Sequence, residues 1–224
     1  MGSSQERRSR IGRPNKGDEL LTTEAVGAAA ALLVDESGLA SLTMRSLAER
    51  LGCTSRALYR HVDGKSALLE LLADRSLADL PEVRSDGAWQ EALEQFFLSF
   101  REVLIGQPAI ALVVAQQTVA GPNFMRHADR VVGVLMTAGF SPSRSMEVVS
   151  SLAYYTLGAS LPGAGQPLQD RWRDLLEGQE FADLPALGEA AERFALDAAA
   201  DRFSSAIRHM LRGYALALSD STHE

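Results

Sequence analysis

Two arginines, a serine and a tyrosine lie close together within residues 51–72 (LGCTSRALYRHVDGKSALLELL), without an acidic residue among them. If this stretch is helical, Ser55 and Tyr59 are i,i+4 neighbours, and Arg56 and Arg60 form a second pair on the same polar face. Arginine can pair with guanine through two hydrogen bonds, serine can read several base edges, and tyrosine can bond to phosphate. A solvated helix usually mixes both signs of charge, so this face favours contact with nucleic acid.

Two short helices joined at Gly52 would position these side chains. Thr43 is a typical N-cap for the first helix, and the second is expected from about Thr54 to His61. A longer helix precedes them, beginning at Thr22 or Thr23 and ending at Gly38, and a fourth is expected from Lys65 to about Leu80. This order predicts a helix-turn-helix motif, in which the second short helix enters the major groove with its N-terminal end first. Lys65 adds a charge where a phosphate could meet both a lysine and a helix dipole.

The rest of the chain also has helical periodicity, and no strand alternation or fixed-length repeat is visible. Helices are expected at residues 89–105, 108–120, 124–138, 142–160 and 189–218, with a looser stretch at 161–188 that holds a short helix around Trp172. We therefore predict an all-α fold of roughly nine or ten helices. Its expected parts are a disordered basic arm (1–17), a three-helix helix-turn-helix DNA-binding domain (18–66) and a larger helical ligand-binding and dimerisation domain (67–224).

Charge is distributed unevenly along the chain. The net charge is −7, but residues 1–70 hold 10 basic and 9 acidic groups, whereas the remainder holds 12 basic and 20 acidic groups. This polarity argues against nucleic-acid binding by the whole surface and favours binding by the N-terminal part. One cysteine, Cys53, excludes an internal disulfide and a cysteine-cluster zinc site. Because no signal peptide and no apolar run long enough for a bilayer are found, we expect a cytoplasmic protein without a membrane partner.

Catalytic and metal sites are not indicated. No nucleophile–base pair, carboxylate pair or phosphate loop is found, so an all-helical enzyme is the weaker alternative. His127 and His209 lack a second ligand at helical spacing, so we expect structural or surface roles for them. We expect no metal and no cofactor.

The segment LTMRSLAERLGCTSRALYRHVDGKSALLELL resembles the N-terminal domain of the Tet repressor (TetR) family of bacterial transcription regulators. The shared features are L-x-x-R-x-L-A-x-x-L-G, L-Y-x-H and K-x-A-L-L, and SFREVL, AGFS and YTLG in the body are similar to the effector domain of the tetracycline-responsive branch. The resemblance implies a homodimeric repressor that binds a palindromic operator and is released by a small inducer. The resemblance implies that Arg45 reads a base and that Lys65 binds a phosphate. The implied recognition-helix contacts are Ser55, Arg56, Tyr59, Arg60 and His61. To these we add Thr54, at the start of the recognition helix. Arg56 and Arg60 depart from the tetracycline repressor, so the operator should differ.

The same resemblance implies a ligand pocket in the body. Phe100 matches an aromatic drug contact, while Ala115 and Pro162 stand where the branch has a histidine and an acid that hold magnesium. We therefore expect metal-free binding of a mainly apolar, aromatic or polyketide-like inducer. The expected lining is Phe96, Phe100, Val131, Met146, Val149 and Tyr154 or Tyr155, with the polar residues Gln116, Gln117 and Thr118.

Two apolar segments, residues 146–157 and 195–218, suit a dimer interface in which each subunit contributes a helix pair to a four-helix bundle. The interface residues expected there are Leu152, Phe203, Ile207, Met210, Leu211 and Tyr214. The alternative is that these side chains form the core of one chain. Two functional alternatives also stay open, a DNA-binding regulator without a small-molecule ligand and an activator of the same fold.

Overall fold

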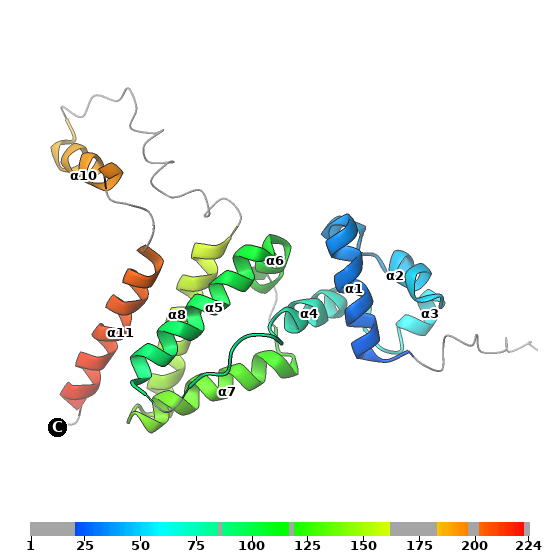
Figure 1. The fold of residues 1–224 in the computed structure, drawn as a ribbon, viewed down its shortest axis with the longest axis horizontal. Helices are drawn as coiled ribbons and strands as arrows, with labels where there is room; N and C mark the ends of the chain where they lie inside the picture. The colour runs from blue at the N-terminus through cyan, green and yellow to red at the C-terminus, as the bar shows by residue number, and fades with distance from the viewer. Residues whose placement is uncertain (1–20, 85–86, 117–118, 162–182, 197–201, 222–224) are drawn as a thin grey trace, which may run out of the picture. The chain divides into compact units, whose positions relative to one another are not determined.

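The computed structural model describes residues 21–84, 87–116, 119–161, 183–196 and 202–221. All regular elements in these ranges are helices (Figure 1), which confirms the all-α prediction. The chain divides into two units, Met1–Leu72 and Ala73–Glu224, whereas the sequence placed the boundary between residues 66 and 67. The predicted arm at 1–17 and the predicted helix around Trp172 lie outside the described residues.

In the N-terminal unit, side chains cap the first turns of α1, α2 and α3. Its elements are α1 (Thr23–Ser37), the 3₁₀ helix η1 (Leu39–Ser41), α2 (Met44–Leu51), α3 (Ser55–Leu58) and α4 (Gly64–Ser76), which continues into the second unit. Thr22 Oγ1 accepts a hydrogen bond from Ala25 N at 3.1 Å and so caps α1, as predicted. Gly52 ends α2 with a φ of 64°, a left-handed conformation that glycine adopts without steric cost.

The third and fourth helices are shorter than predicted. α3 ends at Leu58, and the chain then tightens, since Arg60 N bonds to Ala57 O and His61 N to Leu58 O in i,i+3 fashion. α4 ends at Ser76, four residues before the predicted Leu80. From Leu77 the chain tightens instead, since Leu77 N bonds to Asp74 O and Ala78 N to Arg75 O in i,i+3 fashion.

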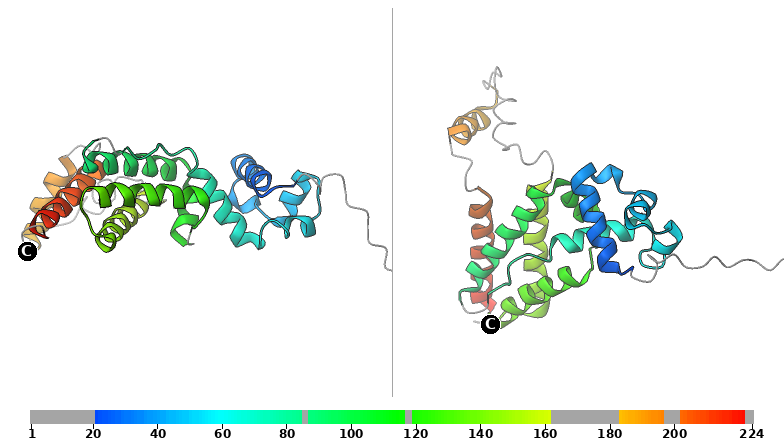
Figure 2. Two further views of the ribbon diagram at one scale, coloured as in Figure 1. Left: turned by 90° about the horizontal axis from the view of Figure 1, so that it is seen from below. Right: turned by 45° about the vertical axis from the view of Figure 1, so that its right-hand side comes forward.

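The C-terminal unit consists of further helices (Figure 2), several of which pack around an apolar core. Its further helices are α5 (Trp89–Gly106), α6 (Pro108–Gln116), α7 (Pro122–Thr137), α8 (Pro142–Ser160), α10 (Pro185–Leu196) and α11 (Arg202–Ser221). α5 packs against α7, α8 and α11, and α6 packs against α5 and α8. The core buries aromatic and aliphatic side chains from α5, α7, α8 and α11, such as Phe97, Leu135, Leu152 and Ile207. Among the described helices, none alone is long and apolar enough to cross a membrane, although α5 and α6 pass that test as a pair bent by 111°.

The last long helix was predicted over residues 189–218. The structure has α10, which begins at Pro185 inside the stretch expected to be loose, and α11, which begins at Arg202. Residues 197–201, on which the continuity of the predicted helix depends, lie outside the described residues.

A buried carboxylate on α4 caps the first turn of α7. Asp74 is 3% exposed, and its Oδ1 accepts from Phe124 N at 2.8 Å. Its Oδ2 accepts from Asn123 N at 3.3 Å and from Asn123 Nδ2 at 2.9 Å. The N-cap residue of α7 is Gly121, which has no side chain with which to cap the helix, so the cap comes from a residue 47 positions earlier in the chain.

Candidate nucleic-acid interface and ligand cavity

The buried faces of α2 and α3 determine which side chains are available at the surface of the N-terminal unit. Leu47 and Ala48 of α2 and Ala57 and Leu58 of α3 are buried. The opposite face exposes Arg45, Thr54, Arg56, Tyr59, Arg60 and Lys65, while Ser55 and His61 are half-buried. The eight residues expected to contact DNA thus all keep some accessible surface.

The geometry of the predicted recognition helix is only partly helical. Tyr59 N bonds to Ser55 O at 3.2 Å, so this pair keeps its i,i+4 relation, whereas Arg60 lies in the tightened turn after α3. Thr54 Oγ1 accepts from Ala57 N at 3.2 Å and caps α3. This hydroxyl is therefore already engaged in the fold, and any DNA contact by Thr54 has to share it.

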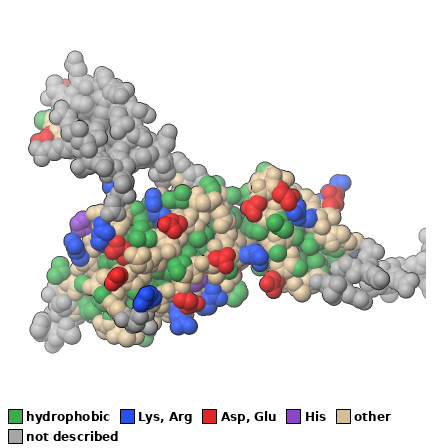
Figure 3. All heavy atoms as spheres, in the orientation of Figure 1, with side chains coloured by type: hydrophobic (Ala, Val, Ile, Leu, Met, Phe, Trp, Pro, Cys, Tyr) green, Lys and Arg blue, Asp and Glu red, His purple; other side chains and the backbone are tan. Residues whose placement is uncertain are grey.

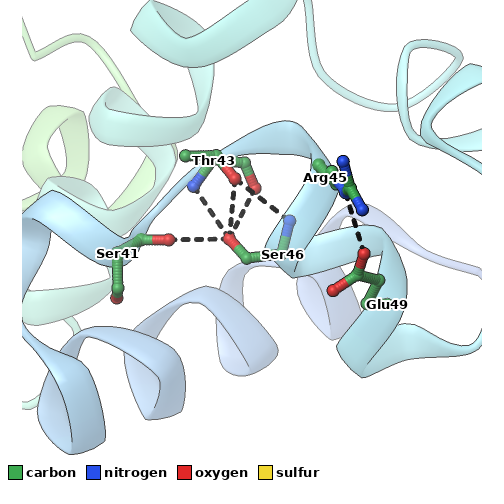
Figure 4. Close-up of polar contacts among 5 residues, drawn as sticks. All are labelled: Ser41, Thr43, Arg45, Ser46 and Glu49. Carbon is green, nitrogen blue, oxygen red and sulfur yellow. Dashed lines mark hydrogen bonds and ion pairs between the residues drawn. The ribbon is translucent and has the colours of Figure 1, made fainter.

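Arg45 stands on the outer face of α2 beside an acid that the sequence reasoning did not consider (Figure 4). Its Nε donates to Glu49 Oε1 at 3.0 Å, and both side chains are highly exposed. The first turn of α2 is fixed by a reciprocal cap, in which Ser46 N donates to Thr43 Oγ1 and Thr43 N donates to Ser46 Oγ. A carboxylate one turn away limits the conformations of Arg45 and can aim its guanidinium outward.

An ion pair with two hydrogen bonds joins α1 to α2 behind this face. Arg50 Nη1 and Nη2 donate to Glu36 Oε2 and Oε1 at 2.6 and 2.7 Å. The hydrogen bond from Arg50 holds the pKa of the Glu36 carboxyl below its ordinary value. It also raises the pKa of Arg50, so both partners stay charged at neutral pH.

The C-terminal unit contains a cleft of about 540 Å³ along α5. Its lining residues are Pro81, Glu82, Val83, Arg84, Gly87, Ala88, Glu91, Ala92, Gln95, Phe96 and Ser99. Of the predicted ligand residues, Phe96 is the one that lines it. Phe96 stacks on Phe100 with ring centroids 6.5 Å apart and meets Phe97 edge-on at 5.4 Å. An aromatic cluster therefore continues from the cleft into the core.

The other predicted ligand residues are scattered. Val131 is fully buried, Phe100, Val149 and Tyr155 are half-buried beside the core, and Gln116 is exposed. Met146 is 55% exposed and Tyr154 76% exposed, so neither faces the interior of the chain. Gln117, Thr118 and Pro162 lie outside the described residues.

Tyr155 belongs to a second aromatic group near α11. Its ring stacks on Phe203 with centroids 5.3 Å apart, and the Arg101 guanidinium lies 4.8 Å from the centroid of the same Phe203 ring. Burial raises the pKa of Tyr155, while the charge of Arg101 acts in the opposite direction. The side chain is therefore an uncharged phenol at neutral pH.

The positions assigned to the dimer interface need a correction. Four of the six predicted residues, Leu152, Phe203, Ile207 and Leu211, are buried in the core of the single chain and offer no surface to a partner. Met210 and Tyr214 are half-buried against the same core. The exposed apolar side chains on the same two helices are Met146 and Tyr154 on α8 and Leu216 on α11. Helical spacing locates an apolar face without saying which element covers it.

Comparison with known proteins decides the family. The profile described as "Bacterial regulatory proteins, tetR family" matches residues 26–72, and "Tetracyclin repressor-like, C-terminal domain" matches residues 80–217, which is more than half of the chain. The chain belongs to the TetR family. Family membership places it among regulators and not among enzymes.

Several relatives of this TetR-family chain are identified by name. The tetracycline repressor protein class G of Vibrio anguillarum is 31% identical over 81% of this chain and 88% of its own. A possible TetR family transcriptional regulator from Streptomyces coelicolor A3(2) has a solved structure with 30% identity and a TM-score of 0.68, covering 87% of this chain and 99% of its own. ActR from Streptomyces coelicolor, solved with actinorhodin, is 24% identical with a TM-score of 0.73, over 87% of this chain and 95% of its own, and shows the shared fold. The chain spans 64% and 66% of the length of two further curated regulators, from Saccharopolyspora erythraea and Streptomyces coeruleorubidus.

Sequence reasoning about this TetR-family chain missed Glu49 and Asp74. The i,i+4 spacing of Arg45 and Glu49 was visible in the sequence and could have revealed their ion pair. No local signal could have linked Asp74 to α7, because its partners are 49 and 50 residues away. Within the described ranges, no group of three or more His, Cys, Asp or Glu side chains is arranged to hold a metal ion.

Proposed function

We propose that this chain is a ligand-responsive repressor that binds a palindromic DNA operator as a homodimer in the cytoplasm and is released by a small, mainly apolar inducer. The observation that carries the proposal is the exposed surface of α2, α3 and the start of α4, which presents arginine, tyrosine and lysine in a segment that matches the family's N-terminal domain. The acid on α2, Glu49, is paired with Arg45.

On DNA, the two short helices α2 and α3 would contact different bases. The N-terminal end of α3 would enter the major groove, where Arg56 reads base edges, and Arg45 would reach a neighbouring base from α2. Lys65, in the first turn of α4, would bind a phosphate and fix the register of the domain on the duplex. Two such units must meet successive major grooves about 34–36 Å apart, which is why a dimer is part of the proposal.

For the inducer, the cleft beside Phe96 is the starting point. The aromatic cluster behind it favours a flat, apolar molecule that binds by burying area, at roughly 25 cal/mol per Å² before the costs of association. Acidic and basic side chains lie beside one another on the face drawn in Figure 3, and the cleft lining also carries both signs of charge, with Glu82, Glu91 and Arg84. The named relatives include tetracycline repressors, and ActR holds actinorhodin, so the fold accommodates multi-ring molecules. Alanine and proline at positions 115 and 162 supply no metal ligand atom.

The test is a footprint on the DNA upstream of the chain's own gene, followed by titration of multi-ring compounds into the complex with and without EDTA. We expect a protected palindrome and release by one compound class that EDTA does not abolish. Absence of any protected site would refute DNA binding. Release that requires a divalent ion would refute the metal-free pocket, and a protected site that no compound class clears would favour a regulator without a small-molecule ligand.

A further inference from the structure

One ring nitrogen of a buried histidine has no hydrogen-bond partner in the described structure. His127 lies on α7 and is 3% exposed. Its Nε2 lies 3.1 Å from Leu77 O. A carbonyl oxygen can only accept, and this contact is shorter than the 3.4 Å that separates Nε2 from Arg126 Nη2, so we assign the proton to Nε2, which leaves Nδ1 as an acceptor. Nδ1 is buried and has no donor among the described residues.

The imidazole has one charged and one aromatic neighbour. The Arg126 guanidinium lies 3.4 Å from Nε2, and the Phe96 ring lies beside the imidazole. Neither supplies a donor to Nδ1, which is a buried acceptor, and such an atom is rare and unfavourable unless a donor reaches it.

Phe96 connects this acceptor with the cleft. Its ring lies 5.8 Å from the imidazole at an angle of 37°, and the same side chain lines the cleft. Val131 follows His127 by four residues, so it lies on the same face of α7, and Phe100 stacks on Phe96. A ligand that enters from the cleft and displaces Phe96 would thus meet these apolar side chains and the unpaired Nδ1.

We propose that His127 Nδ1 accepts a hydrogen bond from a hydroxyl group of the inducer, so that the site selects aromatic molecules carrying a free phenolic hydroxyl. This inference rests on the proposed inducer site and assigns to it a residue that determines specificity. A site with a buried acceptor rejects the analogue that lacks the donor, because the acceptor is then left unpaired. The chemistry requires no metal and no charge on the ligand.

The probes are 2-naphthol and 2-methoxynaphthalene, which differ in the presence of the hydroxyl donor. Binding to the full chain without DNA is measured by calorimetry. We expect the wild type to prefer 2-naphthol by about tenfold, as one hydrogen bond to an otherwise unpaired acceptor provides. No preference, or no binding of either probe, would overturn the inference.

Two variants separate the ring nitrogens. His127→Gln places an amide near the position of Nε2 and can still donate to Leu77 O, but it leaves no acceptor at the position of Nδ1. His127→Asn places its amide oxygen near Nδ1. The preference for 2-naphthol should disappear in His127→Gln and persist in His127→Asn, and its survival in His127→Gln would overturn the inference.

Two further measurements keep the result interpretable. If a variant fails to fold, ¹⁵N spectra of the histidine-labelled wild type provide the test instead. The Nδ1 resonance of His127 should shift when 2-naphthol is added and should not shift when 2-methoxynaphthalene is added. An equal response to both probes would refute the assignment. Operator footprints on the same preparations show whether the proposed function stands, since intact DNA binding without a hydroxyl preference defeats this inference alone.

Discussion

Replacing Gly121 with alanine should break the cap that Asp74 provides for α7. A Cβ at Gly121 would overlap Asp74 Cγ and lie 2.5 Å from its Oδ1 and 2.6 Å from its Cβ. The φ of Gly121 is −72°, which alanine adopts freely, so the backbone itself does not oppose the substitution. The obstacle is space, and the carboxylate has to leave its three hydrogen bonds.

The size of the effect follows from what the carboxylate loses. Asp74 is 3% exposed, and moving it leaves the N–H groups of Asn123 and Phe124 without a cap. Loss of an N-cap costs about 1 kcal/mol, and a buried polar group left unsatisfied adds about 1–3 kcal/mol. We expect Gly121→Ala to lower the free energy of unfolding by about 2–4 kcal/mol, measured by urea denaturation followed by circular dichroism.

Gly133→Ala is the matched control in the same helix. Gly133 is exposed, and a Cβ there would meet nothing within 4 Å. Alanine is the better helix former by about 1 kcal/mol, so this variant should be neutral or more stable. Equal effects of the two substitutions would refute the steric argument.

A double-mutant cycle tests whether Asp74 is the group that the new methyl displaces. In an Asp74→Ala background there is no carboxylate to displace, so adding Gly121→Ala should cost little. If Gly121→Ala costs as much in that background as in the wild type, Asp74 is not the group that the new methyl displaces, and the reasoning fails.

Three other predictions concern the DNA-binding face, the dimer and pH. Arg45→Ala should relax sequence preference and cost about 1–3 kcal/mol per half-site, whereas Lys65→Ala should weaken binding to all DNA sequences alike and lower the salt slope by about one per subunit. Equal loss of specificity from both substitutions in gel shifts would show that these roles are wrongly assigned. Leu216→Asp, at a side chain that is 70% exposed, should shift light scattering toward monomer without lowering the melting temperature of the monomer, and an unchanged dimer would remove α11 from the interface. Arg50 holds the folded-state pKa of Glu36 below its unfolded value, so the pair's contribution to stability is present above the unfolded pKa and is lost as pH falls through the folded-state pKa. Glu36→Gln should flatten this acid dependence of thermal unfolding. An unaltered pH profile would show that the pair contributes nothing to stability.

Local signals in the sequence were sufficient for the helix starts of the N-terminal unit, although α3 and α4 end earlier than predicted. Thr22, Thr43 and Thr54 cap their helices, and Gly52 ends α2. Each of these features depends on residues within one turn, so short-range hydrogen bonding decides them. The same locality explains why the helix-turn-helix and the family resemblance could be read without coordinates. The end of α4 was placed at Leu80, directly before Pro81, because the apolar pattern continues to that residue, whereas the chain already tightens at Leu77.

The sequence by itself determined the helical class, the caps, the polarity of charge and the set of exposed cations, because all of these follow from residue type and spacing along one helix. The tertiary structure alone decided which apolar faces are already covered, as at Leu152 and Ile207, and which remain open, as at Leu216. It also brought Asp74 to the first turn of α7 and His127 to Phe96. A helical period shows that a face is buried, but the partner that buries it comes from another part of the chain, and packing at native density makes that choice.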